Sequence, residues 1–403
     1  MRNMLFLAHR FPYPPDKGEK IRSWNMIRHF ARTWRVHLGC LSDNPGDAAH
    51  LDAVRAVCGE VACFPIDSRQ QKLRALARLR PGRPLMVDYY GHAGLATWVR
   101  RIQRERKIDL AFAYSTPMAE YLLDPDPPPL VLDMVDVDSE KFAAYAGTAA
   151  WPMRLVWARE ARTLLAYEER VALAADVALL VSEAECHRFG ELAPRTCGRV
   201  FAVQNGVDLA YFSPAHNFAS PFPDAAPRLV FTGHMDYPPN AEAAEWFAHK
   251  VMPQLRGRDP APHFVVVGAN PGRAVQALAA LPGVEVTGRV ADVRPYVAHA
   301  AVAVAPLRIA RGIQNKVLEA MAMGRPVVAS PQAYVGVAAA AGRDLLVADG
   351  AENMAAATAS VLDGHHPRLG EAARAAVTGA YSWDGVFTRL DAMLDTALRA
   401  KAR

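Results

Sequence analysis

The sequence has few cysteines, no long apolar run and no clear targeting segment. Its five cysteines form no C-x-x-C pair, and an odd number in a chain of 403 residues argues for free thiols in a reducing compartment. The apolar run 4–8 is too short for a signal peptide. The longer runs 171–181 and 298–307 fall short of the roughly 20 residues that a membrane-spanning helix needs. We therefore expect a cytoplasmic protein with no membrane-crossing segment.

Two glycine motifs that commonly bind nucleotides are also missing. The sequence contains neither G-x-G-x-x-G nor G-x-x-x-x-G-K-[ST]. These absences argue against a nicotinamide-dependent oxidoreductase and against a P-loop enzyme. No recognition motif for nucleic acid accompanies the basic residues either, so we expect no nucleic-acid partner.

Short apolar runs alternate with helical patterns along the whole chain, which predicts parallel sheets with helices on both faces. The expected strands of the first half are Met4–His9, Val36–Ser42, Val61–Ile66, Asp109–Ser115, Leu130–Val135 and Val177–Ser182. Those of the second half are Leu229–Gly233, His263–Gly268, Val284–Thr287, Val302–Pro306, Val327–Ala329 and Leu345–Val347. The fold class is thus α/β, with two doubly wound Rossmann-like domains in succession.

A proline-rich stretch divides the two series of strands. We place the first domain at 1–212, a linker at 213–227, where four prolines crowd a segment of little periodicity, and the second domain at 228–380. The remaining segment, 381–403, is an amphipathic helix. It either crosses back to the first domain or forms a simple terminal cap.

Positive charge is concentrated in one part of the chain. Residues 68–107 contain eleven Lys or Arg against Asp88 and Glu105, although the whole chain carries only +5. Within 69–83, basic residues interleave with leucines and alanines, as in a helix with a basic rim and an apolar stripe. The helix either packs its leucines on its own domain or docks on anionic lipid headgroups.

Ligands of open parallel sheets bind at the carboxyl ends of the strands, so the loops after the strands are the places to search. The loop 9–20 follows the first strand and is rich in proline. In it, Gly18 precedes a helix and leaves room for an anion to approach the backbone N–H groups. His9 and His234 each follow the first strand of a domain and are candidate cleft residues.

The segment 302–328 reads as strand, glycine-containing loop, helix and strand. Gly312 and the N–H groups after it can face a diphosphate at the positive end of the helix dipole. Lys316 lies near that end, and Glu319 lies on the same helical face, where its carboxylate can accept hydrogen bonds from ribose hydroxyls. The alternative is a routine surface pair between the two side chains.

Three carboxylates end the strand around 130–135, at Asp133, Asp136 and Asp138. Asp136 and Asp138 also spell D-x-D, a spacing that can hold a divalent metal. The alternatives are helix capping by Asp138 or Ser139, and orientation of an acceptor by Asp136.

The segment 315–328 resembles the donor-site signature of GT-B glycosyltransferases of the family-four type. The segments 203–212 and 231–240 resemble the end of the first domain and the start of the second domain in that family. The subgroup associated with PEP-CTERM/exosortase exopolysaccharide systems is the most similar, through the segments 9–20, 133–139 and 312–316. One departure is Arg311, which stands where the family commonly has a first glutamate.

This resemblance implies a retaining transferase whose two domains face a central cleft, with a UDP or GDP sugar as co-substrate, no further cofactor and no metal. The acceptor would be a glycan or a lipid-linked glycan, and an anionic membrane would be a peripheral partner at the inner face. We assign catalytic roles to Asp136, Arg308 and Lys316. The donor side comprises Gly18, Gly233, His234, Arg289, Gly312, Ile313, Gln314, Asn315, Lys316 and Glu319. The acceptor side comprises His9, Lys17, Asp136, Asp138 and Asn205.

Two other functions remain open at this point. A nucleotide-sugar epimerase of the same architecture would consume its donor without an acceptor. A non-catalytic partner of a polysaccharide assembly complex would bind nucleotide without turnover.

Overall fold

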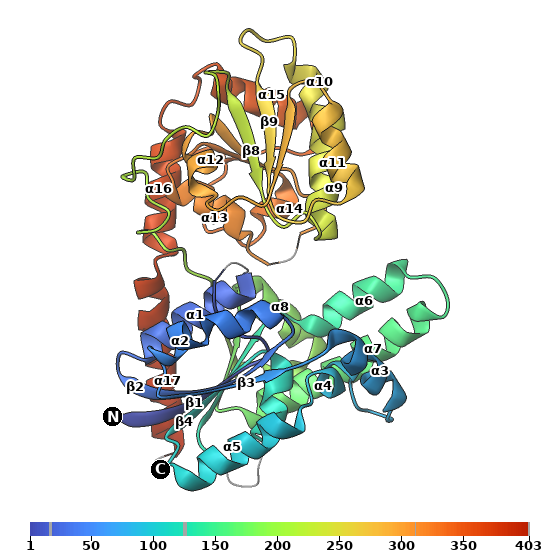
Figure 1. Ribbon diagram of the computed structural model, residues 1–403, viewed down its shortest axis with the longest axis vertical. Coiled ribbons are helices and arrows are strands. Elements are labelled where there is room, and N and C mark those ends of the chain that lie inside the picture. Colours follow the sequence, from blue (N-terminus) through green and yellow to red (C-terminus); the bar gives the residue numbers. More distant parts are fainter. Residues whose placement is uncertain (16–17, 124–126, 311, 402–403) are drawn as a thin grey trace. The chain divides into compact units, whose positions relative to one another are not determined.

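The computed structural model describes residues 1–15, 18–123, 127–310 and 312–401. The chain divides into two compact units (Figure 1), which are treated separately below. The first unit comprises Met1–Gln204 and Val386–Arg403, and the second comprises Asn205–Gly385. No described helix is both long enough and apolar enough to cross a membrane.

The first unit is built on a seven-stranded sheet with the order β3-β2-β1-β4-β5-β6-β7. All six neighbouring pairs are parallel. The strands are β1 (Arg2–Ala8), β2 (Trp34–Ser42), β3 (Glu60–Pro65), β4 (Leu110–Tyr114), β5 (Leu130–Val135), β6 (Val177–Leu180) and β7 (Val200–Ala202). The helices are α1 (Gly18–Phe30), α2 (Leu51–Arg55), α3 (Ser68–Ala77), α4 (Leu85–Tyr89), α5 (Ala93–Glu105), α6 (Asp138–Thr148), α7 (Met153–Ala174) and α8 (Glu183–Leu192), with short 3₁₀ turns η1 (Pro45–His50), η2 (Thr116–Tyr121) and η3 (Pro194–Thr196).

The second unit is built on a six-stranded parallel sheet with the order β10-β9-β8-β11-β12-β13. Its strands are β8 (Arg228–Thr232), β9 (His263–Val267), β10 (Val284–Gly288), β11 (Val302–Ala305), β12 (Val327–Ala329) and β13 (Leu346–Val347). The helices are α9 (Pro238–Trp246), η4 (Phe247–Val251), α10 (Met252–Leu255), α11 (Arg273–Ala277), η5 (Leu278–Ala280), α12 (Arg294–Ala298), α13 (Asn315–Ala322), α14 (Pro331–Tyr334), α15 (Gly350–Leu362) and α16 (Leu369–Ala380).

Both sheets are buried on two faces, which explains their nearly continuous apolar strands. The residues Met4–Ala8 of β1 and Phe264–Val267 of β9 are fully buried. Helices lie on both faces of each sheet in Figure 1. The predicted α/β fold class with two doubly wound domains is therefore confirmed, and each expected strand overlaps an observed one. The short strand β7 was not expected from the sequence.

The strand order reverses direction at one point in each sheet. In the first unit this switch lies between β1 and β4, and in the second between β8 and β11. Such switch points open a crevice beyond the carboxyl ends of the strands, where open α/β sheets bind their ligands. They direct attention to the segments that follow these four strands.

The two units divide earlier in the chain than the proline-rich stretch suggests, and the last helix is shared between them. The compact units divide at Gln204 and Asn205, and the proline-rich stretch 213–227 packs within the second unit, where Phe218 contacts the core and Arg228 lies over the Phe222 ring. In the last helix, α17 (Trp383–Lys401), the residues from Val386 onward belong to the first unit. There, Phe387 stacks on His29 with ring centroids 4.2 Å apart.

The leucines in and after the basic helix α3 are less buried than the interpretation of packing on their own domain expects. The leucines of 69–83 are only partly buried, with Leu73, Leu76 and Leu79 68%, 45% and 51% exposed. The buried residues of α3 are instead Gln71 and Ala75. The side of α3 that faces the protein is therefore short and partly polar.

Candidate functional site

The switch point of the second sheet is shaped by the glycine that follows β8. An ideal Cβ at Gly233 would lie 2.7 Å from Asn240 Nδ2 and 3.0 Å from Lys316 Nζ, so a side chain does not fit. A Cβ at Gly268, which follows β9, would lie 1.7 Å from the Gly233 carbonyl oxygen. The two glycines thus let the loops after β8 and β9 approach closely beside Lys316.

Lys316 comes from the first turn of α13 and is held at this point by two contacts. Its Nζ donates to Asn240 Oδ1 at 2.5 Å and lies 4.5 Å from the centroid of the Phe231 ring. Asn240 in turn donates from Nδ2 to the His234 carbonyl oxygen at 2.9 Å. An amide and an aromatic face thus orient this cation, while the side chain remains partly exposed.

The electrostatics of Lys316 and Glu319 are linked through burial and mutual attraction. Burial lowers the pKa of Lys316 to about 7, against the stabilising charge of Glu319. Burial raises the pKa of Glu319 to about 7, opposed by Lys316. Burial disfavours the charged forms of both groups. An anion near Lys316 would stabilise its ammonium form, and hydrogen-bond donors near Glu319 would stabilise its carboxylate form.

The first backbone amides of α13 can donate hydrogen bonds to an anionic ligand. Gly312 has φ 62°, a conformation that favours glycine, and the turn that it makes leads into the helix. The side chain of Gln314, the N-cap residue, does not cap the helix but donates to the Gly312 carbonyl oxygen at 3.2 Å. Within the part of the chain that the structure describes, the buried Oδ1 of Asn315 has no hydrogen-bond partner. The first amides of α13 therefore remain available to an anion.

Of the other residues predicted to bind the sugar donor, one lies in the core and two lie on the surface. Ile313 is buried, at 8% exposure, and contributes to the core rather than to an open surface. Arg308 is exposed and pairs with Glu242 of α9 at 3.3 Å. Arg289, one residue after β10, is exposed as well. Arg311 lies outside the described residues.

Two residues near Glu319 were missed by the sequence reasoning. Burial chiefly raises the pKa of Tyr211, and the charges of Asp292 and Glu319 add to the rise. The Arg294 guanidinium lies 3.7 Å from the centroid of the Tyr211 ring and pairs with Asp292 at 2.7 Å. Tyr211 and Arg294 are 83 residues apart, and no local spacing could have joined them to Glu319.

The switch point of the first sheet has a different chemistry. His9, one residue after β1, packs against Tyr114 at 5.8 Å and Tyr90 at 5.4 Å between ring centroids. Its buried Nδ1 has no hydrogen-bond partner among the described residues, while Nε2 lies 3.7 Å from Glu19 Oε2. Aromatic rings and a carboxylate thus surround this histidine, and the cation beside it, Arg10, is paired with that same carboxylate, Glu19, at 3.0 Å.

Asp133 of β5 has a structural role, whereas Asp136 and Asp138, which follow β5, lie at a polar edge of the unit. Asp133 is fully buried and accepts from Arg22 Nε at 2.7 Å, so it belongs to the core of the first unit. Burial, with the charges of Glu185 and Asp138, raises the pKa of Asp136 to about 7. The Asp136 side chain nevertheless reaches solvent, which moderates this rise. Asp138 has a raised pKa for the same primary reason, burial.

The helix-capping interpretation of this segment is not supported. Val137 is the N-cap residue of α6, and its own side chain makes no capping hydrogen bond; the Glu185 carboxylate accepts from the Val137 amide at 2.9 Å. Ser139 instead donates from Oγ to Glu168 Oε2 at 2.5 Å and from its backbone N to Oε1 at 3.1 Å. Burial raises the pKa of Glu168 to about 8. Glu168 and Glu185 come from α7 and α8, so sequence proximity gave no sign of this cluster.

The backbone at the same edge is strained. Ser115, directly after β4, has φ 81°, and Val135, at the end of β5, has φ 71°. A positive φ is unusual for a β-branched residue, and such strain concentrates at functional sites. Of the remaining predicted residues, Gly18 begins α1, Asn205 begins the second unit, and Lys17 lies outside the described residues.

Comparison with known proteins identifies the chemistry of the second unit. Residues 226–364 match the family described as Glycosyl transferases group 1. The match covers 139 of the 403 residues, all of them within the second unit. This match spans α13 and the loop after β8, the two segments that hold Lys316, Glu319 and Gly233. Since the chain also has the two-sheet GT-B fold, the protein is a glycosyltransferase.

Solved structures show the fold over nearly the whole chain. Sucrose-phosphate synthase from Thermosynechococcus elongatus has a TM-score of 0.70 at 15% identity, covering 99% of this chain and 100% of that one. Anabaena Alr3699/HepE in complex with UDP-glucose has a TM-score of 0.68 at 15% identity, with 98% and 100% covered. WaaG, a glycosyltransferase involved in lipopolysaccharide biosynthesis, has a TM-score of 0.65 at 16% identity, with 97% and 99% covered. No curated protein matches the sequence.

Proposed function

We propose that the protein transfers a sugar, with retention, from a nucleotide-diphosphate sugar bound by the second unit to a glycan or lipid-linked acceptor. The observation that carries this proposal is the position of Lys316. Its ammonium is oriented by Asn240 and Phe231 at the switch point, beside the N-terminus of α13 and beside Gly233, whose lack of a side chain lets Asn240 and Lys316 approach the backbone.

Two kinds of group hold the donor in this proposal: positively charged groups hold its diphosphate, and a carboxylate holds its ribose. The diphosphate lies at the first amides of α13, with Lys316 as its counter-charge, because helix N-termini and cations both favour anions. Glu319, on the same helical face, accepts hydrogen bonds from the ribose hydroxyls. The ligand would thereby stabilise the charged forms that burial disfavours in the free protein.

Catalysis then depends on stabilising the departing nucleotide. Cleavage of the bond between sugar and phosphate leaves an oxocarbenium-like sugar and an anion, so positioned cations supply the main electrostatic effect. Lys316 and Arg308 are the candidate cations. Attack by the acceptor on the face that the nucleotide leaves, with the departing phosphate taking the acceptor's proton, accounts for retention without a protein nucleophile. Asp136 is the candidate group of the first unit for orienting the acceptor hydroxyl.

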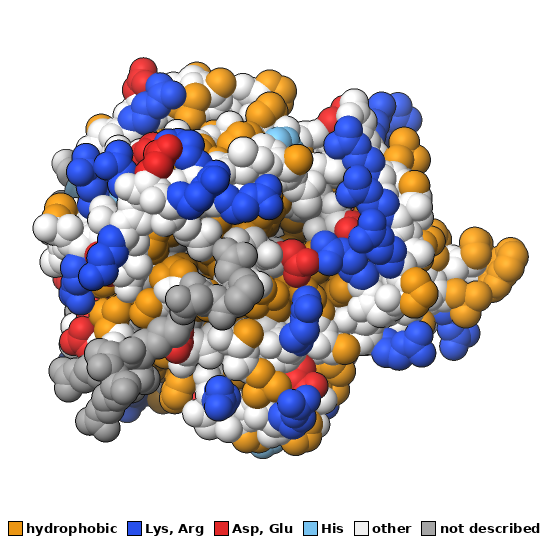
Figure 2. Space-filling model, turned by 90° about the horizontal axis from the view of Figure 1, so that it is seen from below, with side chains coloured by type: hydrophobic (Ala, Val, Ile, Leu, Met, Phe, Trp, Pro, Cys, Tyr) orange, Lys and Arg blue, Asp and Glu red, His pale blue; other side chains and the backbone are white. Residues whose placement is uncertain are grey.

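The pathway of the protein and its place in the cell are proposed from the sequence resemblance and from the residues exposed on its surface. We place the protein in exopolysaccharide assembly, of the type linked to PEP-CTERM/exosortase systems, because of the sequence resemblance. A peripheral place at the inner face of a membrane is supported by the exposed leucines Leu73, Leu76 and Leu79 among basic residues of 69–83. Figure 2 shows a dense group of Lys and Arg side chains bordered by apolar ones on one face of the molecule.

Binding of nucleotides to the purified protein tests the donor site. UDP is the first ligand to try, since the structurally similar Alr3699/HepE was solved with UDP-glucose; GDP and NADH are the comparisons. Lys316→Ala and Glu319→Ala should each weaken UDP or GDP binding by roughly 1–3 kcal/mol, the loss expected for charge-assisted hydrogen bonds.

Lys250→Ala provides the control, because Lys250 is an exposed lysine of the same unit. Equal losses in all three variants, or no binding of either nucleotide, would contradict the site. Binding followed by turnover of the sugar nucleotide without any acceptor would instead favour the epimerase. Binding without turnover in a membrane extract would favour the non-catalytic partner.

A further inference from the structure

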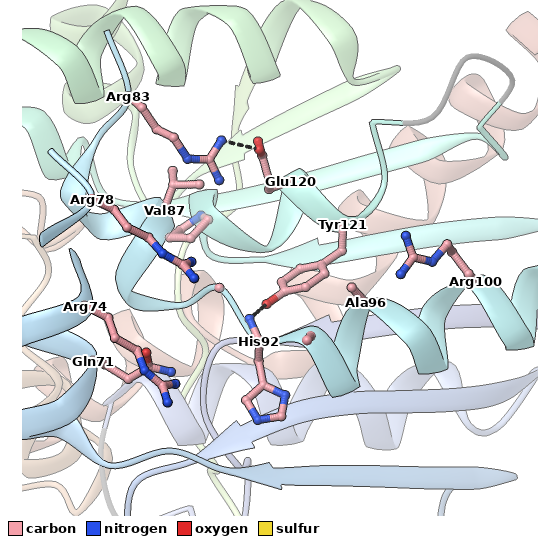
Figure 3. Close-up of a pocket in the computed structure, with 13 residues that line it drawn as sticks. Gln71, Arg74, Arg78, Arg83, Val87, His92, Ala96, Arg100, Glu120 and Tyr121 are labelled. Atoms are coloured by element: carbon pink, nitrogen blue, oxygen red, sulfur yellow. Dashed lines mark hydrogen bonds and ion pairs between the residues drawn. The ribbon is translucent and has the colours of Figure 1, made fainter. Parts of the chain in front are cut away.

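The first unit contains a pocket that the proposed transfer does not use. It is bounded by α3, α4, the start of α5 and η2, and its volume is about 540 Å³ (Figure 3). This size is in the range of small-molecule sites. Val87, Ala96 and Pro117 supply apolar parts of its lining, and the remainder is mainly basic or polar.

Three of the arginines that line this pocket are not paired with Glu120, the carboxylate of its lining, which pairs instead with Arg83 and Arg170. Arg74, Arg78 and Arg100 come from the α3 region and from α5, and their side chains point toward the same space in Figure 3. Within the part of the chain that the structure describes, none of the three guanidinium groups forms an ion pair. Arg83, at the rim, shows the contrast, because it pairs with Asp88 at 2.9 Å and Glu120 at 2.7 Å.

Neutral groups at the pocket also suit an anion. Gln71 is only 3% exposed and lines the pocket, and its side chain has no hydrogen-bond partner among the described residues. His92, the N-cap residue of α5, accepts at Nδ1 from the Leu95 amide at 3.3 Å. A neutral His92 ring therefore carries its proton on Nε2, as a donor.

The loop at the start of α5 is fixed. Tyr121 accepts from the His92 amide at 2.8 Å and donates to the Tyr90 carbonyl oxygen at 2.6 Å. This bridge holds the N-terminus of a 13-residue helix at the pocket, where its dipole favours negative charge. Preorganised donors of this kind reduce the entropic cost of binding.

We propose that this pocket binds a phosphate monoester through Arg74, Arg78 and Arg100, as a site separate from the nucleotide site of the second unit. The fork of each guanidinium matches phosphate oxygens, and three positive charges balance a dianion with a further donor from Gln71. The ester is either a soluble metabolite or the headgroup of an anionic lipid. The proposal does not depend on the assignment of Lys316 and Glu319.

Two probes with the same phosphate chemistry separate these sources. Glycerol 3-phosphate, followed by titration calorimetry, tests the soluble ester. Phosphatidylcholine vesicles containing phosphatidic acid, followed by flotation, test the lipid. We expect Arg74→Ala, Arg78→Ala and Arg100→Ala each to weaken binding of the effective probe about fivefold to tenfold, as loss of a charge-assisted hydrogen bond implies.

Arg69→Ala is the matched control, because Arg69 lies on α3 and is exposed but does not line the pocket. It should change binding less than about twofold, since solvent and salt screen distant surface charges. Gln71→Glu, nearly equal in volume, should abolish binding by placing negative charge in the pocket. UDP binding and far-UV circular dichroism of the same samples show that each variant is folded.

Arginine-dependent binding of glycerol 3-phosphate assigns the pocket to a soluble ester, and arginine-dependent binding of the vesicles alone assigns it to a lipid. The proposal is overturned if neither probe binds. It is also overturned if Arg69→Ala weakens binding as much as the pocket variants, because diffuse attraction would then account for it.

Discussion

The two units share one strand order but line their switch points with opposite chemistry. In the second unit, glycines, a helix N-terminus and Lys316 meet beyond β8 and β11. In the first, the corresponding edge has aspartates, an aromatic-packed histidine and two residues with positive φ. The fold therefore determines where a ligand binds, and the local residues determine which ligand.

The difference extends to how each unit uses its charged groups. The first unit buries an ion pair, Arg22 with Asp133, fully within its core. The second leaves Lys316 and Glu319 partly exposed, with pKa values that burial moves toward each other. Charge in the first case supports structure, whereas charge in the second is available to a ligand.

Breaking the buried pair should give the largest effect. Asp133→Asn leaves the Arg22 guanidinium buried without its carboxylate, and removing one partner of such a pair costs about 3–5 kcal/mol. Chemical denaturation, followed by tryptophan fluorescence, measures the loss of stability. Arg308→Ala is the comparison, because its exposed pair with Glu242 is worth about 1 kcal/mol or less. Similar losses in the two variants would show that Arg22 and Asp133 are not a structural pair.

A methyl group at Gly233 tests the space beside Lys316. Gly233→Ala places Cβ at 2.7 Å from Asn240 Nδ2 and 3.0 Å from Lys316 Nζ. We expect displacement of Lys316 and a loss of nucleotide affinity of about 1–3 kcal/mol, as for loss of its charge-assisted hydrogen bond to the diphosphate. Gly272→Ala is the control, because no atom lies within 4 Å of its added Cβ. Unchanged affinity for UDP and GDP in Gly233→Ala would show that Lys316 does not contact the nucleotide.

Proton uptake distinguishes a ligand-binding lysine from a structural one. With the pKa of Lys316 lowered to about 7, the free protein has mostly neutral Lys316 near pH 8. A diphosphate stabilises the charged form and raises this pKa, so binding should take up about one proton there, and affinity should fall as pH rises above about 7. Calorimetry in buffers of different ionisation enthalpy measures the uptake. Lys316→Met should bind weakly and without uptake; uptake that persists in this variant would assign the proton to another group.

The sequence was most informative where function depends on neighbours along the chain. Lys316 and Glu319 are three residues apart, and Gly312 precedes their helix, so periodicity and a turn residue were enough to propose them as candidates. The strands were recognisable because both faces of each sheet are buried, which leaves apolar runs in the sequence.

Contacts between distant segments could not be predicted in this way. Asn240 orients Lys316 across 76 residues, and Arg22 pairs with Asp133 across 111. The leucines of α3 show the opposite failure, since their periodicity suggests packing whereas the structure leaves them exposed. Spacing alone does not identify the surface against which a helix packs.

We expect the smallest effect from removing the charge of Glu242, which competes with the nucleotide phosphate for Arg308. Glu242 pairs with it at 3.3 Å, and both side chains are exposed, so Glu242→Gln should change stability by less than about 1 kcal/mol. If Arg308 assists the departing phosphate, releasing it and removing a nearby negative charge should strengthen nucleotide binding by about 0.5–1 kcal/mol. Glu245→Gln on the same helix is the control, because Glu245 forms no ion pair among the residues described. Equal affinity in the two variants would remove Arg308 from the site and leave Lys316 as its principal cation.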